Sequence, residues 1–245
     1  MKKKLLLTAI IIFFTLFTFV HGYKYEKTIN RSFKINKDGV FSLKNINGDV
    51  KFKTYDGNEI KVIAEKRSNY KDYFEELEII FEKSENMLKI YTKRNRKNCR
   101  VSINYQVKIP ENLSSTKISV VNGKLSGYGN LKDIILKTVN GKINYEGNFN
   151  KGEVSSVNGS VHIFTKDKVR DNISVRTVNG SISIELNEDS DIKVKAGTIN
   201  GSIRSDFNIK TTKGFIGSKA EGSVNKGEHY IKLKTVNGSI KILQN

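Results

Sequence analysis

Apolar and polar residues alternate with a period of two through most of the chain after residue 22. The alternation is clearest at residues 101–109, 161–164 and 182–186, which are rich in Val and Ile. A period of two places successive side chains on opposite faces of a β-strand, so each segment is expected to have one buried face. Gly, Asn, Asp and Ser separate the segments, as turn residues do. The pattern therefore predicts an all-β protein.

Between residues 23 and 110, short turn sequences join the predicted strands. Asp38-Gly39, residues 56–58 and residues 84–86 each lie between two apolar segments. Such residues favour tight turns between antiparallel neighbours. Pro110 ends the last strand of this region, because proline has no N–H for a sheet ladder. We therefore expect an irregular antiparallel β region over residues 23–110.

A repeated six-residue unit organises residues 111–245, and residues 235–240 (Thr-Val-Asn-Gly-Ser-Ile) are a typical copy. From Asn122 onward the Asn-to-Asn spacings are 18, 18, 21, 21 and 37 residues. The last spacing is about two periods, so we expect a degenerate copy at residues 221–224. The Asn-Gly pairs, including one earlier isolated copy, are Asn47-Gly48, Asn122-Gly123, Asn140-Gly141, Asn158-Gly159, Asn179-Gly180, Asn200-Gly201 and Asn237-Gly238.

Two arrangements are compatible with a recurring Asn-Gly pair. Asn-Gly is the strongest signal for a two-residue β-hairpin, and a hairpin at every copy would form a meander. Val139 would then face Lys142 across the strands, and each copy would place an apolar residue beside a polar one in the same way. In the alternative, each period of 18–21 residues forms one coil of a β-solenoid, and equivalent residues stack in columns.

The match between residue types in successive copies favours the solenoid. Stacking places Val over Val, Asn over Asn, Gly over Gly and Ile or Val over Ile, around a continuous core. Asn side chains can hydrogen-bond along their column, and Gly allows a tight corner. We therefore predict a β-solenoid, a β-helix-like stack of 18–21-residue repeats, over residues 111–245. The repeated Asn and Gly residues would have a structural role in it.

The first 22 residues have the pattern of a secretory signal peptide. Lys2, Lys3 and Lys4 precede an uncharged apolar run at residues 5–20, and Val20 and Gly22 are small enough for a cleavage site. The alternative is an uncleaved N-terminal anchor. Sixteen helical residues would span about 24 Å, short of the roughly 30 Å hydrocarbon core of a bilayer. We therefore expect export, to a periplasm, the cell surface or the medium.

A resemblance to a known family follows from these features together. The strand ending in Val107-Lys108-Ile109-Pro110 and the series of Asn-Gly units behind a signal sequence resemble the DUF4097 family of bacterial adhesin-like β-strand-repeat proteins. The resemblance covers about residues 33–245. It implies an exported or envelope-associated β-solenoid with no known catalytic residues.

The charge is strongly positive, with 43 Lys and Arg against 25 Asp and Glu, or +18. Without residues 1–22, which hold three Lys and no acid, the net charge is +15. Such a chain attracts anionic polymers and acidic lipid head groups. Because the excess charge is spread evenly over both halves of the chain, a specialised nucleic-acid domain is not indicated. The densest basic cluster, expected to be a polyanion contact or simply a basic hairpin tip, is Lys93, Arg94, Arg96, Lys97 and Arg100.

Residues suited to catalysis or metal binding are few and scattered. His21, His162 and His229 are far apart, and Cys99 is the single cysteine. We expect His162 on an exposed strand and His229 in a turn. Residues 188–191 hold three acids, which we expect to form a solvated coil corner rather than a weak Ca²⁺ site. The sequence has no phosphate-binding, zinc-protease or nucleophile-elbow motif. We therefore expect no catalytic residue, no metal and no cofactor.

Together these observations predict a non-enzymatic, adhesin-like module of the cell envelope or surface. Its partner would be an anionic surface polymer or an envelope protein, and multivalent weak contacts would supply the affinity. One alternative is a regulatory partner of a membrane protein in envelope stress, which would use an edge of the solenoid for β-augmentation. A polysaccharide-active enzyme is the third hypothesis. The oligomeric state is left open.

Overall fold

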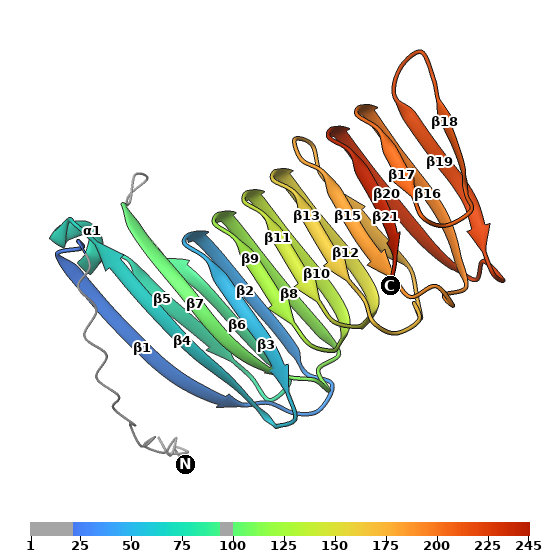
Figure 1. The fold of residues 1–245 in the computed structure, drawn as a ribbon. Coiled ribbons are helices and arrows are strands. Elements are labelled where there is room, and N and C mark those ends of the chain that lie inside the picture. Colours follow the sequence, from blue (N-terminus) through green and yellow to red (C-terminus); the bar gives the residue numbers. More distant parts are fainter. Residues whose placement is uncertain (1–21, 94–99) are drawn as a thin grey trace.

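The computed structural model describes residues 22–93 and 100–245. Two long β-sheets face each other, and short corners connect them (Figure 1). This arrangement confirms the predicted all-β, solenoid-like fold with antiparallel strands at its N-terminal end. Of the predicted signal peptide, residues 1–22, only Gly22 lies within the described residues. No helix in the described ranges is long and apolar enough to cross a membrane.

Sheet A has ten strands and sheet B has eleven. In spatial order, sheet A consists of β1 (Tyr25–Lys34), β4 (Glu59–Ser68), β7 (Val101–Pro110), β3 (Val50–Tyr55), β9 (Leu125–Tyr128), β11 (Ile143–Glu146), β13 (Val161–Phe164), β15 (Ile182–Leu186), β21 (Ile240–Gln244) and β17 (Ile203–Ser205). Sheet B consists of β18 (Lys210–Lys213), β19 (Ser218–Val224), β16 (Ile192–Asn200), β20 (His229–Asn237), β14 (Ile173–Arg176), β12 (Phe149–Asn158), β10 (Leu131–Asn140), β8 (Ser115–Asn122), β2 (Val40–Asn47), β6 (Met87–Lys93) and β5 (Glu78–Lys83).

Each Asn-Gly pair lies at a corner where the chain leaves sheet B and enters sheet A. The resulting coils are β2/β3, β8/β9, β10/β11, β12/β13, β14/β15, β20/β21 and β16/β17. Neighbouring coils pair in parallel without a slip: Asn140 lies level with Asn122 on one side and Asn158 on the other. Because each Asn-Gly pair connects two different sheets, the alternative of a hairpin at every copy is excluded.

The core fills the space between the two sheets. The apolar residue two positions after each Gly points inward, so Leu125, Ile143 and Val161 form one buried column that continues through Ile182 and Ile240. These five side chains are at most 1% exposed. Since a single coil has no partner for such a side chain, the core exists only in the stack.

The order of coils in space differs from their order in the chain. The last coil, β20/β21, lies between β14/β15 and β16/β17 (Figure 1). Residues 221–224 belong to β19, which pairs antiparallel with β16, so the predicted degenerate copy at residues 221–224 is wrong. After β17 the chain forms the outer β18–β19 hairpin, and the next strand, β20, then lies between β14 and β16. The spacing of 37 residues between Asn200 and Asn237 arises because this hairpin lies between the two coils in the chain.

Antiparallel strands close the N-terminal end of the stack. β1 pairs with β4 and β4 with β7 in sheet A, and β5 pairs with β6 in sheet B. Of the three expected turn sequences, only residues 84–86 join strands that pair with each other. The strands on either side of Asp38-Gly39 lie in different sheets, and β7 separates the strands on either side of residues 56–58. Because β2 and β3 form a coil, each finds its partners in neighbouring coils instead.

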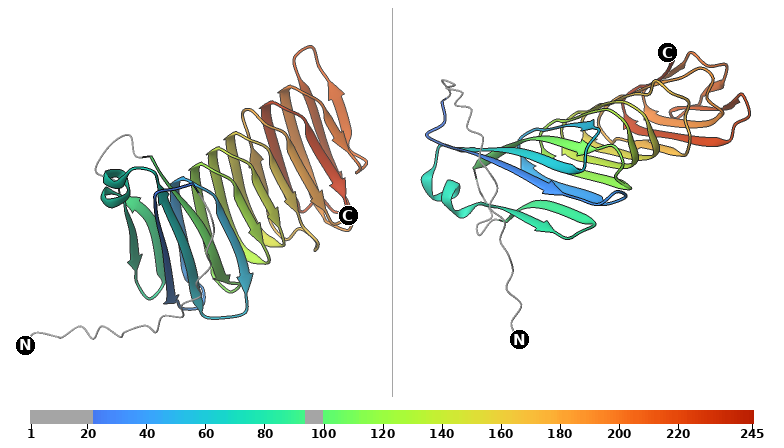
Figure 2. Two further views of the ribbon diagram at one scale, coloured as in Figure 1. Left: turned by 60° about the vertical axis from the view of Figure 1, so that its left-hand side comes forward. Right: turned by 90° about the horizontal axis from the view of Figure 1, so that it is seen from below.

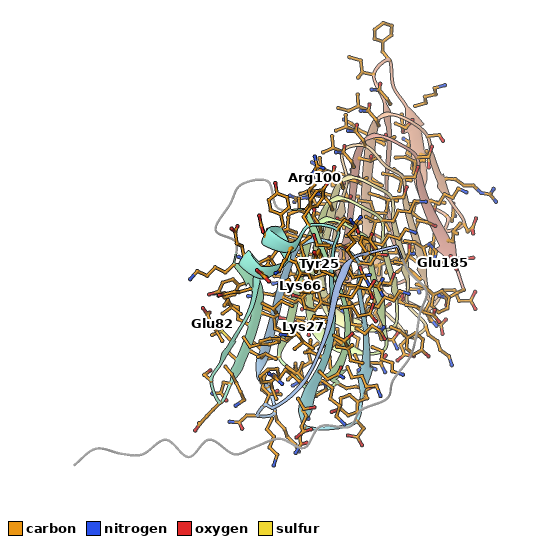
Figure 3. The ribbon with its side chains drawn as sticks, turned by 90° about the vertical axis from the view of Figure 1, so that its left-hand side faces the viewer. Tyr25, Lys27, Lys66, Glu82, Arg100 and Glu185 are labelled. Atoms are coloured by element: carbon orange, nitrogen blue, oxygen red, sulfur yellow. The ribbon has the colours of Figure 1, made fainter. Side chains whose placement is uncertain are left out.

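The short helix α1 (Lys71–Glu76) follows β4 at this end, where the two sheets separate (Figure 2). The ammonium of Lys66, 7% exposed, donates to the carbonyl oxygen of Leu77 at 2.5 Å and lies 4.4 Å from the centroid of the Phe74 ring. Figure 3 looks onto this end and shows Lys66 near α1. Farther along the gap, the rings of Phe33 and Phe81 stack with centroids 5.3 Å apart. These contacts fill the opening between the sheets.

Candidate binding surface

The seven Asn side chains at the corners form one continuous column. Six of the seven donate from Nδ2 to the Oδ1 of the neighbouring Asn, with Nδ2–Oδ1 distances of 2.7–2.9 Å. At the end of the column, Asn47 donates to the carbonyl oxygen of Val101 at 3.3 Å. In spatial order the column is Asn47, Asn122, Asn140, Asn158, Asn179, Asn237 and Asn200. The amides are exposed, but their strongest partners are one another, so this column holds the coils in register.

The Gly residues permit close approach between neighbouring corners. A Cβ on Gly141 would overlap the carbonyl oxygen of Gly123, and a Cβ on Gly159 would overlap that of Gly141. The same relation holds at Gly123, Gly180, Gly201 and Gly238, each against a Gly carbonyl of a neighbouring coil, and at Gly48 against the Ile103 carbonyl of β7. The structure therefore places all fourteen of the Asn and Gly residues singled out in the sequence at contacts with neighbouring strands of the stack.

The residue before each Asn faces outward and forms a second column, which we call the apolar stripe. Val121, Val139 and Val157 are 39–40% exposed, and Ile199 is 50% exposed. The stripe consists of Ile46, Val121, Val139, Val157, Val178, Val236 and Ile199. The Val column predicted from the sequence is thus outside the core. The residue before each stripe residue is buried, and in five of the seven copies it is Thr or Ser; a period of two then directs the next residue to solvent.

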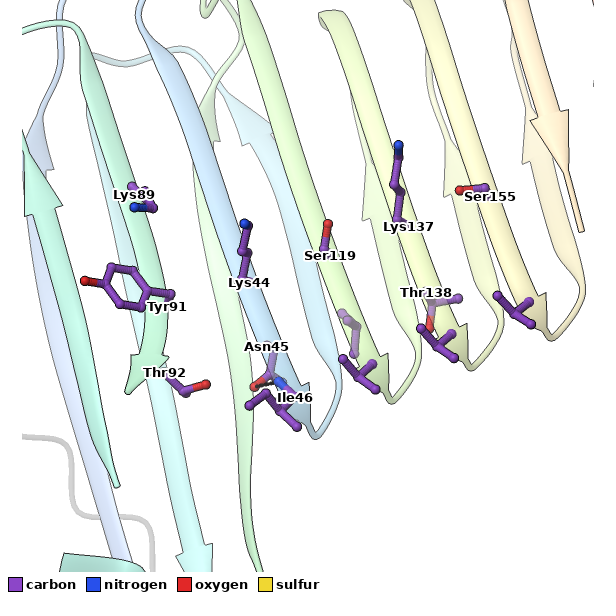
Figure 4. A pocket seen from close by; sticks show the side chains of 14 residues that line it. Lys44, Asn45, Ile46, Lys89, Tyr91, Thr92, Ser119, Lys137, Thr138 and Ser155 are labelled. Atoms are coloured by element: carbon purple, nitrogen blue, oxygen red, sulfur yellow. Dashed lines mark hydrogen bonds between the residues drawn. The ribbon is translucent and has the colours of Figure 1, made fainter. Parts of the chain in front are cut away.

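Two positions before the stripe, a row of mainly cationic and small residues runs parallel to it. In Figure 4, Lys44, Ser119, Lys137 and Ser155 follow one another across four neighbouring strands. The row continues through Arg176 and Lys234 and ends at Gly197. We call this row, defined by Lys44, Ser119, Lys137, Ser155, Arg176, Lys234 and Gly197, the basic row. It lies on the outer face of sheet B.

A groove of about 610 Å³ lies where the basic row and the apolar stripe meet β6. Its walls include Lys44, Lys89, Tyr91 and Lys137, with stripe residues such as Ile46 along the corner side (Figure 4). Lys137 pairs with Glu153 at 2.8 Å between Nζ and Oε1. Lys44 forms no ion pair with any residue in the described part of the chain. The groove therefore combines apolar surface with one ammonium group, that of Lys44, that is available to an anionic ligand.

A hydrogen-bonded trio fixes one wall of the groove. Glu82 accepts from the ammonium of Lys89 at 2.8 Å and from the hydroxyl of Tyr91 at 2.6 Å. Both bonds lower the pKa of the Glu82 carboxyl, and the bond from Lys89 has the larger effect. The same bonds to Glu82 raise the pKa of Lys89 and of Tyr91. Lys89 also lies 4.7 Å from the centroid of the Tyr91 ring. The trio thus holds the ring of Tyr91 against the groove.

The cluster expected to contact polyanions is only partly described. Arg94, Arg96 and Lys97 lie outside the described residues, as does Cys99. Lys93 is exposed at the end of β6. The guanidinium of Arg100 donates to the hydroxyl of Tyr70 at 2.8 Å and lies 5.4 Å from the centroid of that ring. Lys93 and Arg100 are the two members of the cluster within the described residues, and the polyanion contact stays a prediction.

The remaining polar residues considered from the sequence are dispersed. His162 is exposed on β13, with its Nε2 3.6 Å from Glu185. His229 begins β20, so its expected position in a turn is wrong, because the strand starts at this residue. Asp189 and Asp191 lie at a coil corner, and Asp191 accepts the Lys226 amide at 3.0 Å. In residues 22–93 and 100–245 no three His, Cys, Asp or Glu residues group as a metal site would require.

The apolar stripe and the basic row were not predicted from the sequence as one surface. The signal was present in Lys137-Thr138-Val139 and in Lys234-Thr235-Val236. Once Thr is assigned to the core side, alternation directs both Lys and Val outward. That assignment requires knowing that the Thr hydroxyl has a buried acceptor. The acceptor is the carbonyl oxygen of a Gly in the neighbouring coil, for example Gly180 for Thr235 at 2.8 Å.

Comparisons with known proteins point to one family. The family model described as Toastrack DUF4097 matches residues 112–243. Among solved structures, a "putative cell adhesion protein" from Clostridium sporogenes is 14% identical, with a TM-score of 0.49 over 89% of this chain and 100% of that chain. A "putative adhesin" from Bacteroides fragilis is 15% identical, with a TM-score of 0.45 over 89% of this chain and 97% of that chain. No curated protein matches the sequence.

Proposed function

This chain belongs to the Toastrack DUF4097 family, and from that premise we propose that it is an exported, non-enzymatic, adhesin-like module that binds an anionic polymer of the cell envelope. The binding surface would be the outer face of sheet B, where the basic row runs beside the apolar stripe. The N-terminal pattern of residues 1–22 supports export. The net charge of +15 after that segment supports an anionic partner.

The observation that carries the proposal is the regular spacing of the basic row. Neighbouring strands lie about 4.8 Å apart, so Lys44, Lys137 and Arg176 follow at intervals of about 10 Å. Lys234 comes one strand after Arg176. A linear polymer with regularly spaced anionic groups could contact several of these cations at once. Each contact is weak in water, but contacts made together add to a higher affinity.

Binding of this kind depends on salt. Charges separated by more than about 8 Å are largely screened at physiological ionic strength, and polyanion affinity falls as salt displaces the condensed counterions. The apolar stripe and the Tyr91 ring would add a component that salt does not weaken. We therefore expect affinity to fall steeply with salt without vanishing at physiological concentration.

The test measures binding of residues 23–245 to dextran sulfate, with unmodified dextran as the neutral probe. Replacing Lys44, Lys137, Arg176 and Lys234 by Gln should weaken binding at least tenfold. The matched control replaces Lys51, Lys53, Lys108 and Lys241 by Gln, which removes the same charge from exposed positions on the outer face of sheet A. Equal losses in both variants would show attraction by net charge alone, and absence of binding at physiological salt would reject the proposal.

Two further measurements address export and the absence of catalysis. Fractionation of expressing cells with N-terminal sequencing of the protein is expected to give a chain that begins at Tyr23 outside the cytoplasm. A chain that keeps Lys2 to Lys4 would favour the uncleaved anchor. A reducing-end assay on acidic glycans is expected to show no release, and release would favour the polysaccharide-active enzyme.

A further inference from the structure

We propose that the tip of the β18–β19 hairpin docks the protein onto an anionic lipid bilayer by inserting Phe215 and Ile216. The tip, which we call the apolar tip, is the turn at residues 214–217 (Gly-Phe-Ile-Gly). Phe215 is 106% exposed and Ile216 is 76% exposed. These are the two most exposed large hydrophobic side chains in the described residues; the next is Tyr128 at 60%. The inference does not depend on polymer binding by sheet B.

The geometry of the turn produces this exposure. Lys213 and Ser218 form the last strand pair, and the amide of Gly214 donates to the carbonyl oxygen of Gly217 at 3.0 Å. Gly217 has φ +78°, which favours Gly, and a Cβ there would overlap the carbonyl oxygen of Thr198. Phe215 and Ile216 therefore occupy the two central positions of a closed four-residue turn. Neither side chain can pack back onto a sheet unless this turn opens.

The position of the apolar tip makes it accessible to a flat surface. β18 is the outermost strand of sheet B, and all four of its residues are exposed. Figure 1 and the left view of Figure 2 show the hairpin projecting beyond the row of Asn-Gly corners. A planar bilayer can reach a projecting turn of this kind, but it cannot enter the groove on sheet B.

The charge around the apolar tip indicates which surface it fits. Lys213 and Lys219 flank the tip, and residues 207–220 contain no acid, while Lys210 at the far end of β18 lies level with Glu221. Lys side chains beside an inserted apolar group extend their ammonium groups toward lipid phosphates while the carbon chain stays in the interface. Stable membrane attachment generally needs two signals, such as an apolar group together with a basic patch. The hairpin carries both.

A bilayer fits this feature better than a pocket on a protein. A stable protein interface buries about 800 Å² per partner, far more than two side chains on a narrow hairpin provide. Insertion into a fluid interface requires no matching shape. The two apolar residues and the two flanking cations, Lys213 and Lys219, then act on the same lipid surface at the same time.

The experiment uses residues 23–245 with vesicles of phosphatidylglycerol and phosphatidylcholine, and with vesicles of phosphatidylcholine alone. We expect co-sedimentation with the anionic vesicles only. Replacing Phe215 and Ile216 by Ser should lower the partition coefficient at least tenfold, and replacing Lys213 and Lys219 by Gln should lower it on anionic vesicles. The matched control replaces Ile63 and Tyr128, two exposed apolar residues on sheet A, by Ser and should bind as the parent does.

Insertion can be read directly because the chain contains no Trp. Phe215→Trp places a single reporter at the apolar tip, and Tyr128→Trp places one on sheet A. We expect a blue shift and quenching by brominated lipid at position 215 and neither at position 128. The inference is overturned if the parent protein ignores anionic vesicles, if the Ser variant at the tip binds them equally, or if the reporter at 215 stays in water. Unchanged binding of dextran sulfate by the Ser variant separates this result from the proposed function.

Discussion

A single carbonyl oxygen explains why both Thr and Gly recur in the repeat. The hydroxyl of Thr198 donates to the Gly238 carbonyl at 2.8 Å, and a Cβ on Gly201 would overlap that same oxygen. At Gly141, Gly159, Gly180 and Gly201 no positive φ requires Gly. The expectation that Gly serves only to turn a corner is therefore incomplete, because close approach between neighbouring coils requires it as well.

Replacing Gly159 by Ala should destabilise the protein by about 1–3 kcal/mol, since the new methyl group meets backbone that cannot move aside. Gly197→Ala is the matched control. A Cβ at Gly197 meets nothing within 4 Å, so this change should be neutral or stabilise by about 0.4–1 kcal/mol. Urea unfolding of the two variants measures the difference. Equal midpoints would contradict the steric role of the corner Gly.

The Glu82 trio predicts a specific response to pH. Because the pKa of Glu82 is lower in the folded chain, its contribution to stability is complete above the usual carboxyl pKa and is lost as pH falls through the lowered value. Carbon NMR of the Glu82 carboxyl follows the titration. Lys89→Gln should move the pKa back toward the usual range, and Tyr91→Phe should do so by less. An unchanged pKa of Glu82 in both variants would show that these hydrogen bonds do not form.

At the scale of the element, one coil depends on the next through its corner. The Asn column links seven coils by side-chain hydrogen bonds that no coil could form alone. The neighbouring backbone adds to this link, for example where the Gly180 amide donates to the Asn237 carbonyl at 3.0 Å. Asn outside the core thus sets the register, while Ile and Val supply the burial.

An Asn in the middle of the column should matter more than one at its end. Asn158 donates to Asn140 and accepts from Asn179, whereas Asn200 only donates, to Asn237. Replacement by Ala should cost about 1 kcal/mol per lost bond, so Asn158→Ala should destabilise about twice as much as Asn200→Ala. Thermal unfolding gives the comparison. A larger effect at Asn200 would show that the column does not act as a chain of equal bonds.

For the whole molecule, the decisive feature is the inserted last coil. β20 pairs with β14 on one side and with β16 on the other, so the C-terminal residues of the chain lie inside the stack. The coil β16/β17, which comes before β20/β21 in the chain, is the outer coil, and the β18–β19 hairpin covers its edge in sheet B. In this arrangement β20 pairs with strands far from it in the chain. The outer coil β16/β17 is therefore joined to the rest of the stack only through β20 and β21.

Ending the chain at Glu228, which removes β20 and β21, should therefore release residues 192–224 rather than merely shorten the stack. Without β20 and β21, β16 keeps only its antiparallel partner β19 and β17 loses its pairing, so the sheet of β16, β19 and β18 is detached from the rest of the stack. Limited proteolysis with mass spectrometry should show rapid cleavage in residues 192–224. The Phe215→Ser and Ile216→Ser double variant, which removes no core contact, should stay resistant. Protection of residues 192–224 in the truncated chain would contradict the inserted order.

The alternation of residue types by itself determined the strands, the stacked coils and the family, because side-chain period and repeat matching are local properties of the chain. Only the tertiary structure decided which coil neighbours which. The corners at Asn179, Asn200 and Asn237 have nearly identical sequences, so the repeated units alone do not specify that β20 lies between β14 and β16. The same holds for the apolar stripe, whose outward direction follows from the buried acceptor of Thr on a neighbouring coil.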